Sequence, residues 1–104
     1  MGLDGLGRFA DPAVLLLSSL AGGDKHGYAL IKDIEDFAGV RLGPGTLYGA
    51  LSRLEERGLV EALAADDRRR PYRLTAPGAK ALHDYLQHAR AVATVGLHRL
   101  AASA

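Results

Sequence analysis

Residues 43–60, GPGTLYGALSRLEERGLV, constrain the fold more than any other stretch, because they describe one short helix with two unlike faces. At about 100° per residue, four apolar positions share one narrow arc, which predicts a buried side. These positions are Leu47, Ala50, Leu51 and Leu54. Gly58 predicts where the helix ends, since glycine readily adopts the left-handed conformation that closes a helix.

Two further helices are expected before this one. Asp11 followed by Pro12 predicts a helix start, and this helix runs through Leu20 as a buried element. A second helix begins near His26, which is expected to act at its start, and ends at Gly39. Its apolar residues recur at helical spacing. They are Tyr28, Ile31, Ile34 and Phe37 or Ala38.

The periodicity changes after residue 58. LVEALA (59–64) and PYRLT (71–75) are short β-capable runs on either side of ADDRRR, which predicts a two-stranded hairpin with a charged tip. Thr75 then caps a final helix, with Pro77 in its first turn, that runs to about Leu100. The order predicts a mainly α fold with a small β-hairpin, a winged helix-turn-helix followed by a long helix. We expect a flexible arm over residues 1–10, the winged helix over 11–76 and the final helix over 77–104.

The outer face of the helix over 43–58 carries few long charged side chains. Small residues would let this helix approach the bases and the backbone in the major groove. There, its hydroxyl groups and Arg53 can donate hydrogen bonds to phosphates or base edges. Taken alone, this stretch is equally well interpreted as an ordinary amphipathic helix whose Gly49 packs against a neighbour. The predicted DNA contacts are Gly45, Thr46, Tyr48, Gly49, Ser52 and Arg53, with His26 and Tyr28 from the preceding helix.

The hairpin tip carries three adjacent arginines, Arg68, Arg69 and Arg70, and Arg73 follows on the second strand. Adjacent guanidinium groups suit phosphates or a narrow minor groove. In isolation, a solvated turn in which Asp66 and Asp67 pair with these arginines is the better interpretation. Because the hairpin follows a candidate recognition helix, however, contact of these arginines with DNA is favoured over the solvated turn.

The final helix has an apolar stripe that is longer than one small core requires. Pairing with a second copy would bury it, and folding back on the first helix is the alternative. A two-fold dimer would read two half-sites about 34 Å apart. The predicted interface consists of Phe9, Leu15, Leu82, Tyr85, Leu86, Ala89, Val92, Ala93, Gly96, Leu97 and Leu100.

Size and composition exclude several classes of protein. A chain of 104 residues fits one domain, and the absence of cysteine excludes disulfides and Cys-based zinc sites and suits the cytoplasm. The net charge divides into −3 over residues 1–40, +2 over 41–75 and +2 over 76–104, which sums to the overall +1. His83 and His88 are five residues apart and do not share a helix face. No catalytic constellation is present in the sequence, so we expect no enzyme activity, no metal and no cofactor.

No segment is long enough to span a membrane. AVLLLSSLAGG (13–23) is similar to a signal-peptide core, but the residues before it are net negative where a leader needs positive charge. We therefore expect a cytoplasmic protein in which this segment is a core helix.

Three stretches resemble the PadR family of bacterial transcriptional regulators: HGYALIKDIEDFAG (26–39), residues 43–60, and RRRPYRLTAPG (68–78). The resemblance covers about residues 11–80 in unbroken order. It implies a homodimeric winged-helix repressor that releases DNA when a small molecule binds. It also implies that residues 44–57 enter the major groove, 60–75 form the wing, and 82–100 form the dimer, often with help from the first helix.

The chain departs from the family in two ways. Many members have proline where this chain has Gly49, so that contact differs. With one C-terminal helix, the chain resembles the short branch of the family, in which an effector pocket lies between subunits or under the helices. Nothing in the sequence argues for a ligand class.

The resulting hypothesis is a sequence-specific, DNA-binding transcriptional regulator, a ligand-responsive repressor acting as a homodimer on a pseudo-palindromic operator. The alternatives are a ligand-sensing winged-helix regulator of another family and a winged-helix protein–protein module that does not bind DNA. The operator, the regulated genes, the effector, the direction of regulation and the role of the arm at the interface stay open.

Overall fold

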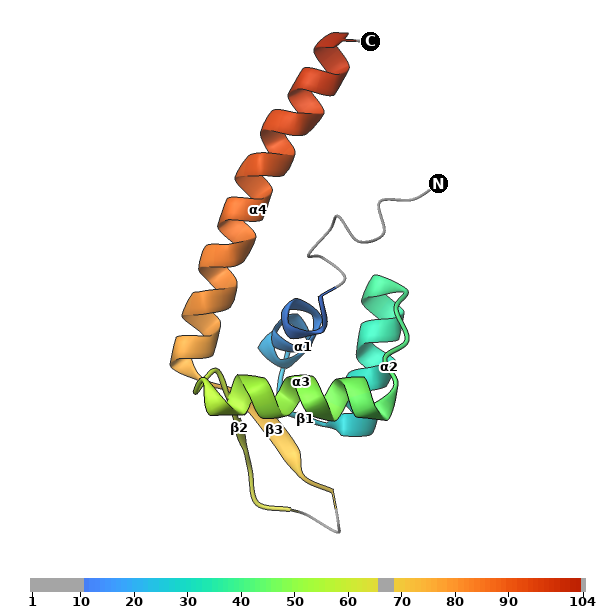
Figure 1. Cartoon of the computed structure of the whole chain (residues 1–104), viewed down its shortest axis with the longest axis vertical. Coiled ribbons are helices and arrows are strands. Elements are labelled where there is room, and N and C mark those ends of the chain that lie inside the picture. The colour runs from blue at the N-terminus through green and yellow to red at the C-terminus, as the bar shows by residue number, and fades with distance from the viewer. Residues whose placement is uncertain (1–10, 66–68, 104) are drawn as a thin grey trace.

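The computed structural model describes residues 11–65 and 69–103, which form four helices and one three-stranded antiparallel sheet (Figure 1). The predicted arm over residues 1–10, including Phe9, and the tip residue Arg68 lie outside the described residues. The elements in chain order are α1 (Pro12–Ala21), β1 (Lys25–His26), α2 (Gly27–Ala38), α3 (Pro44–Glu56), β2 (Val60–Ala62), β3 (Pro71–Leu74) and α4 (Ala76–Ser103). The predicted fold class, mainly helical with a small sheet, is confirmed.

The helices begin and end where the local sequence chemistry places them. The Ala13 amide donates to Asp11 Oδ1 over 2.9 Å, so Asp11 caps α1 as predicted. His26 caps α2, because its Nδ1 accepts from the Ala29 amide. Gly58, which follows the C-cap residue Arg57 of α3, has a φ of 75°, the left-handed conformation that stops a helix.

α1 lies between α2 and α4 and packs on α3 (Figure 1), so that the core forms where the helices meet. The apolar side of α3 is buried as predicted, and so are four leucines of α1. The core residues are Leu15, Leu16, Leu17, Leu20, Leu30, Ile34, Leu42, Leu47, Ala50, Leu51, Leu54, Val60 and Leu82.

The buried side of α2 differs from the predicted stripe. Gly27, Leu30 and Ile34 face the core, whereas Tyr28 and Phe37 are exposed. Close packing at the start of the helix contributes to this difference: a Cβ on Gly27 would meet the end of the Tyr48 side chain, which lies against α2 at this glycine. The true buried arc is rotated by about one residue from the predicted one.

The sheet has one strand more than predicted. The two-stranded hairpin is present, with Val60 opposite Leu74 and Ala62 opposite Tyr72. β1 adds a third strand on the other edge of β3, with Lys25 opposite Tyr72 and His26 opposite Pro71, in the order β1-β3-β2. The wing is therefore joined to the segment between α1 and α2.

α4 begins in the core and then leaves it. Thr75 caps it as predicted, since Thr75 Oγ1 accepts from the Gly78 amide and donates to the Gly58 carbonyl. Gly78 is buried, and a Cβ there would overlap the Leu59 carbonyl oxygen. Leu82 is the last buried residue of the helix.

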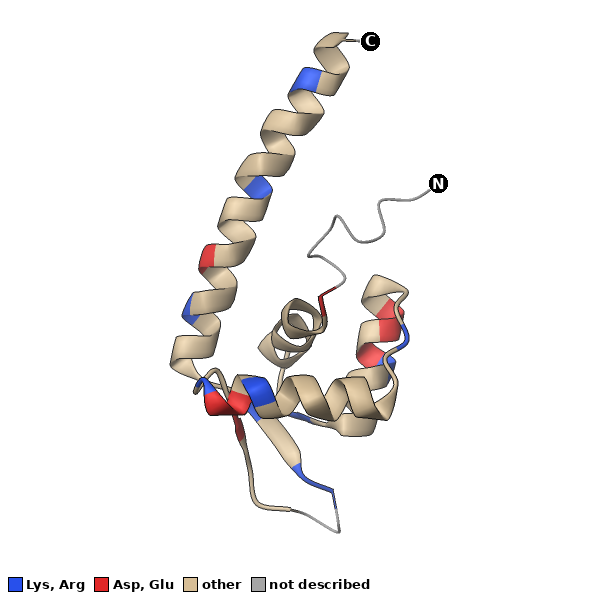
Figure 2. Cartoon of the chain, viewed as in Figure 1, with Lys and Arg blue, Asp and Glu red and all other residues tan. Residues whose placement is uncertain are grey.

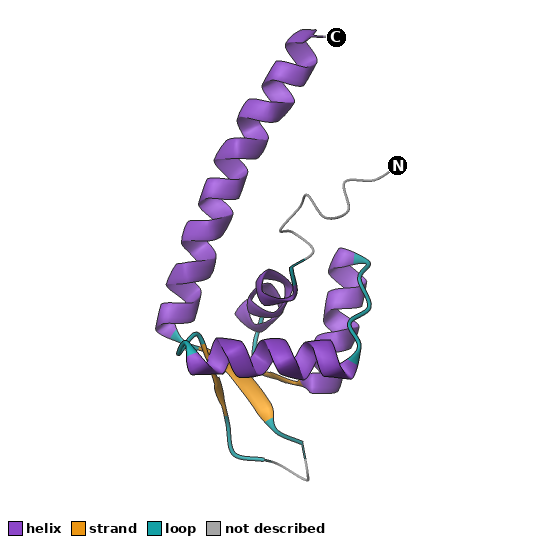
Figure 3. Ribbon diagram, in the orientation of Figure 1, coloured by secondary structure: helices purple, strands orange, loops and turns teal. Residues whose placement is uncertain are grey.

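No described residue buries the second half of α4. Every residue over 90–103 is exposed, although the helix has 28 residues and so is about 42 Å long. The wing and the free end of α4 extend in opposite directions from the helical body (Figure 3), and the longest dimension of the molecule is 56 Å. Among residues 11–65 and 69–103, no helix combines the length and hydropathy that a membrane span requires.

Candidate nucleic-acid interface

The outer face of α3 is open to solvent. Of the predicted contacts on this helix, five are exposed and Gly49 is half-buried. The exposed five are Gly45, Thr46, Tyr48, Ser52 and Arg53. The surface that the sequence singles out is therefore accessible along its whole length.

The glycines on this face are not packed against other elements of the described chain. A Cβ on Gly45 would have no heavy atom of another element within 4 Å. On Gly49 it would meet only the Arg53 guanidinium, at 3.7 Å, which is ordinary van der Waals contact. Within the described residues, the interpretation in which Gly49 packs against a neighbour is wrong.

We expect substitutions of two helical glycines to have opposite effects on stability. Gly78→Ala should lower the free energy of unfolding by about 1–3 kcal/mol, because the new methyl must displace backbone at Leu59. Gly49→Ala should raise it by about 0.5–1 kcal/mol, because alanine restricts the unfolded chain and meets no obstacle. Urea denaturation of both variants measures these changes. A loss of stability in Gly49→Ala would restore the packing interpretation.

Tyr48 stands at one edge of the α3 face. It is about half exposed, and its hydroxyl lies over Gly27, at the start of α2. A Cβ at position 27 would overlap that hydroxyl, so the absence of a side chain at Gly27 determines where the Tyr48 ring lies. The phenol group remains reachable from solvent as a donor.

The wing arginines lie beside Tyr48. A hollow of about 280 Å³ is lined by side chains from the start of α2, from α3 and from the segment before β3. Its lining residues are His26, Gly27, Tyr28, Tyr48, Arg69 and Arg70. Five predicted DNA contacts from three separate parts of the chain therefore border one concave site.

Tyr72 on β3 is half-buried and packs against the core. Burial raises the pKa of the Tyr72 hydroxyl, and the nearby Glu55 and Tyr48 raise it further, while Arg70 opposes them. Both α3 residues therefore lie close enough to Tyr72 to act on its charge, so the wing flanks the Tyr48 side of α3.

A second hollow, of about 330 Å³, borders the other edge of α3, where the helix meets the start of α1. Arg53 and Arg57 line it together with Asp11, Ala13, Ala50 and Leu54. Neither arginine forms an ion pair with another described residue. Arg57 is not among the predicted contacts, although its spacing of four from Arg53 was a usable signal that both share one helix edge.

The uncharged part of the α3 face, over residues 45–52, thus lies between two basic edges, with Arg69 and Arg70 on one side and Arg53 and Arg57 on the other. The exposed Glu55 and Glu56 follow at the C-terminal end of the helix. Figure 2 shows basic segments where β3 begins and on α3, acidic segments at the C-terminal end of α3, and the acidic segments of α2 away from the wing. Arg69 and Arg70 are exposed and form no ion pair with another described residue. Their alternative partners, Asp66 and Asp67, lie outside the described residues.

Arg73 is engaged within the sheet. It forms an ion pair with Glu61, directly opposite on β2, and this hydrogen bond raises the pKa of its guanidinium above the ordinary value. Part of its charge is therefore compensated by Glu61, unlike that of Arg69 and Arg70.

α4 presents most of the predicted dimer residues to solvent. Leu97 and Leu100 are each 69% exposed, and Leu86 and Val92 are also open. Leu15 and Leu82 are buried in the core of their own chain, which leaves them little surface for a second copy. Tyr85 and Ala89 are half-buried, while Ala93 and Gly96 are exposed.

The apolar surface of α4 is wider than the predicted stripe. Val95 is 48% exposed and borders a shallow hollow of about 390 Å³ with His88, Ala91, Val92, Gly96 and Arg99. Residues two apart on a helix point in nearly opposite directions, so Val95 and Leu97 place apolar surface on both sides of α4. Val95 is not part of the predicted stripe, because a single apolar stripe covers only one side of a helix.

The histidines form no cluster. Among the residues that the structure describes, no group of three or more histidine, aspartate or glutamate side chains could hold a metal ion. His26 serves instead as the α2 cap, the helix-start role expected of it.

Comparison with known proteins places this geometry in a family. The sequence model of the PadR-like family of transcriptional regulators matches residues 16–84. A transcriptional regulator from Clostridium thermocellum superposes with a TM-score of 0.75, at 26% identity over 91% of this chain and 93% of the other. A PadR family transcription regulator from Clostridium difficile has the same TM-score, with 28% identity over 86% and 94%.

A longer relative shares the sequence more closely. A 37.1 kDa protein of a Streptomyces fradiae transposon is 49% identical over 75 residues, 72% of this chain. The chain spans only 22% of that protein's length. The family match covers more than half of the present chain and agrees with the expectation of a regulator without enzyme activity. From its fold, its exposed α3 face and this match, the chain belongs to the PadR-like family of transcriptional regulators.

Proposed function

We propose that the protein is a cytoplasmic, ligand-responsive repressor that binds a pseudo-palindromic DNA operator as a homodimer. In this proposal α3 enters the major groove, and the wing contacts the adjacent backbone. Repression and ligand response follow the resemblance to the family, whereas the DNA surface and the second copy are argued from the chain itself.

The observation that carries the proposal is the pair of basic edges beside the α3 face. A helix in the major groove has a phosphate backbone on each side, with a groove about 12 Å wide between them. Small and hydroxyl side chains at the centre of α3 leave room for base edges. In this proposal Arg69 and Arg70, which line one hollow beside α3, contact one backbone, and Arg53 and Arg57, which line the other hollow, contact the second.

A second copy is supported by the free half of α4. A single helix with exposed Val92, Val95, Leu97 and Leu100 leaves apolar surface in water that another chain can bury. Because this surface occupies both sides of α4, we propose that the partner covers it with α4 and with a second segment. Leu15 and Leu82 then support the interface from within the core rather than joining it.

Salt dependence of DNA affinity tests the proposal. If each copy engages about four phosphates, the dimer should show a log–log slope near −7, from about −0.9 per phosphate. The measurement is a titration of a labelled mixed-sequence duplex across several salt concentrations. Affinity that is independent of salt would contradict the backbone contacts proposed for the arginines.

A further inference from the structure

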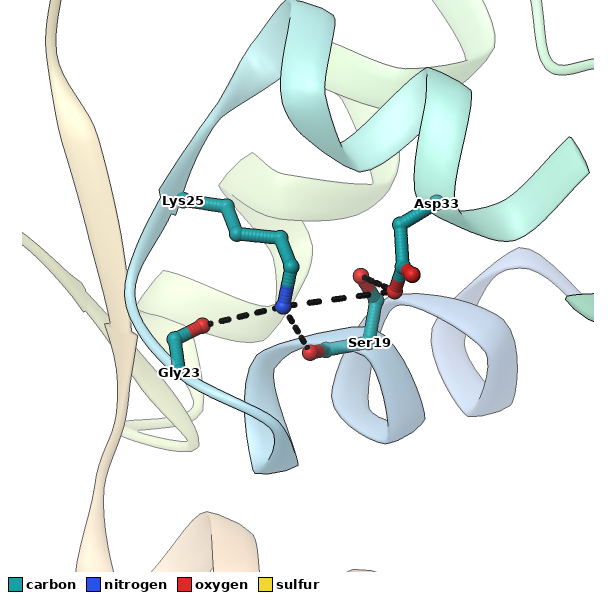
Figure 4. Close-up of polar contacts among 4 residues, drawn as sticks. All are labelled: Ser19, Gly23, Lys25 and Asp33. Atoms are coloured by element: carbon teal, nitrogen blue, oxygen red, sulfur yellow. Dashed lines mark hydrogen bonds and ion pairs between the residues drawn. The ribbon is translucent and has the colours of Figure 1, made fainter. Parts of the chain in front are cut away.

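A polar cluster at the end of α1 lies outside the candidate DNA surface. It brings together Ser19 of α1, Lys25 of β1 and Asp33 of α2 (Figure 4). Ser19 is only 2% exposed and is the single polar side chain among the buried described residues. Buried polar groups are costly unless they are fully bonded, so such a cluster specifies one arrangement of its elements.

Each member of the cluster bonds to another element. Lys25 Nζ donates to the Ser19 carbonyl over 2.5 Å and to the Gly23 carbonyl over 3.2 Å. It also lies 3.9 Å from Asp33 Oδ2, which accepts from Ser19 Oγ over 2.5 Å. The lysine ammonium therefore sits at the carbonyl end of α1, where a positive charge is favourable.

The position of Lys25 links this cluster to the wing. β1 consists only of Lys25 and His26, and both pair with β3, opposite Tyr72 and Pro71. So short a strand has little stability of its own. The cluster holds one end of β1, and the His26 cap of α2 holds the other.

We infer that Lys25, fixed by Ser19 and Asp33, is a positioning residue for DNA binding: it anchors β1 and, through the β1–β3 pairing, orients Arg69 and Arg70 relative to Tyr48. This inference rests on the proposed function, because it concerns the same DNA surface. Arg70 immediately precedes Pro71, the β3 residue that pairs with His26. The β1–β3 pairing therefore ends next to the wing arginines. Loosening the cluster lets the wing move while α3 keeps its own core contacts.

A charge-matched pair of substitutions on α2 tests the inference. Asp33→Ala loosens the cluster, because it removes the acceptor of Ser19 Oγ and the carboxylate beside Lys25, and Asp36→Ala removes the same charge at an exposed site of the same helix. Electrostatics alone predicts slightly tighter DNA binding for both, since each removes a negative charge. Positioning predicts that Asp33→Ala instead weakens binding to a duplex of about 30 base pairs by about fivefold. Equal behaviour of the two variants would overturn the inference.

A double-mutant cycle separates wing positioning from general destabilisation. In a background that already carries Arg69→Ala and Arg70→Ala, the Asp33→Ala penalty should fall to less than about twofold, because the wing contacts are gone. A penalty that persists in full would show that the cluster does not act through the wing, and would overturn the inference.

Amide hydrogen exchange supplies a readout that needs no DNA. Asp33→Ala should speed exchange in β1 and β3 more than in α3, and Asp36→Ala should not. Unchanged exchange in β1 and β3 would also overturn the inference. If the wild-type chain bound no duplex, the proposed function would fail, yet the exchange result would still report whether the cluster anchors the wing.

Discussion

Replacing Arg69 and Arg70 together with alanine is expected to lower duplex affinity by at least about 100-fold on every sequence. Loss of these two side chains in each of two copies would remove up to four phosphate contacts. Each such contact is a charge-assisted interaction of about 1.5 kcal/mol or more. The log–log salt slope should become shallower by about 3–4. Fluorescence anisotropy across a salt series measures both quantities.

The matched control removes two positive charges elsewhere. Lys80→Ala with Arg90→Ala changes the net charge equally, on exposed positions of α4 away from the candidate DNA surface. This variant should keep nearly the full slope. Ser52→Ala, at the centre of the α3 face, should change discrimination between sequences and leave the slope unchanged. An equal loss in the control and in the wing variant would mean that only net charge matters.

Leu97→Asp combined with Leu100→Asp is expected to convert the proposed dimer into a monomer. Both leucines are largely exposed on the free half of α4, so the single chain has no packing to lose, while a dimer would have to bury four carboxylates. Sedimentation equilibrium at micromolar concentration should show one 11.0 kDa chain for the variant and two for the wild type.

Thr94→Asp provides the control on the same helix. Thr94 is exposed on the same half of α4, and its hydroxyl donates to the Arg90 carbonyl. A carboxylate there should leave the dimer intact. A wild-type chain that sediments as a monomer, or dissociation caused equally by Thr94→Asp, would contradict the proposed interface.

Much of the fold follows from local signals in the sequence. Asp11, Gly58 and Thr75 each act on the backbone within a few residues, and the structure has all three in the predicted roles. The buried side of α3 was also predictable, because one arc of that helix is apolar and the other is not. In α2 two overlapping arcs of the helix carry apolar residues, so the sequence does not decide which of them is buried. Gly27 packs closely against Tyr48, but a glycine is not counted as apolar in a hydrophobic pattern.

The remaining features depend on contacts between distant residues. β1 has two residues and no alternation, and its partners follow more than forty residues later, so no local pattern announces it. The Lys25 cluster likewise joins residues 6 and 14 apart, on separate elements. Arg57 could have been found from its spacing to Arg53, whereas the hollow that joins Tyr48 to the wing required the packed structure.

Amide chemical shifts on addition of a duplex test most directly whether α3 and the wing form one DNA surface. The largest changes are expected over residues 44–53 and 69–70 and at the start of α2, with little change over 33–41, at the acidic end of α2. Changes confined to α4, or changes in α3 without any in the wing, would contradict a single DNA surface.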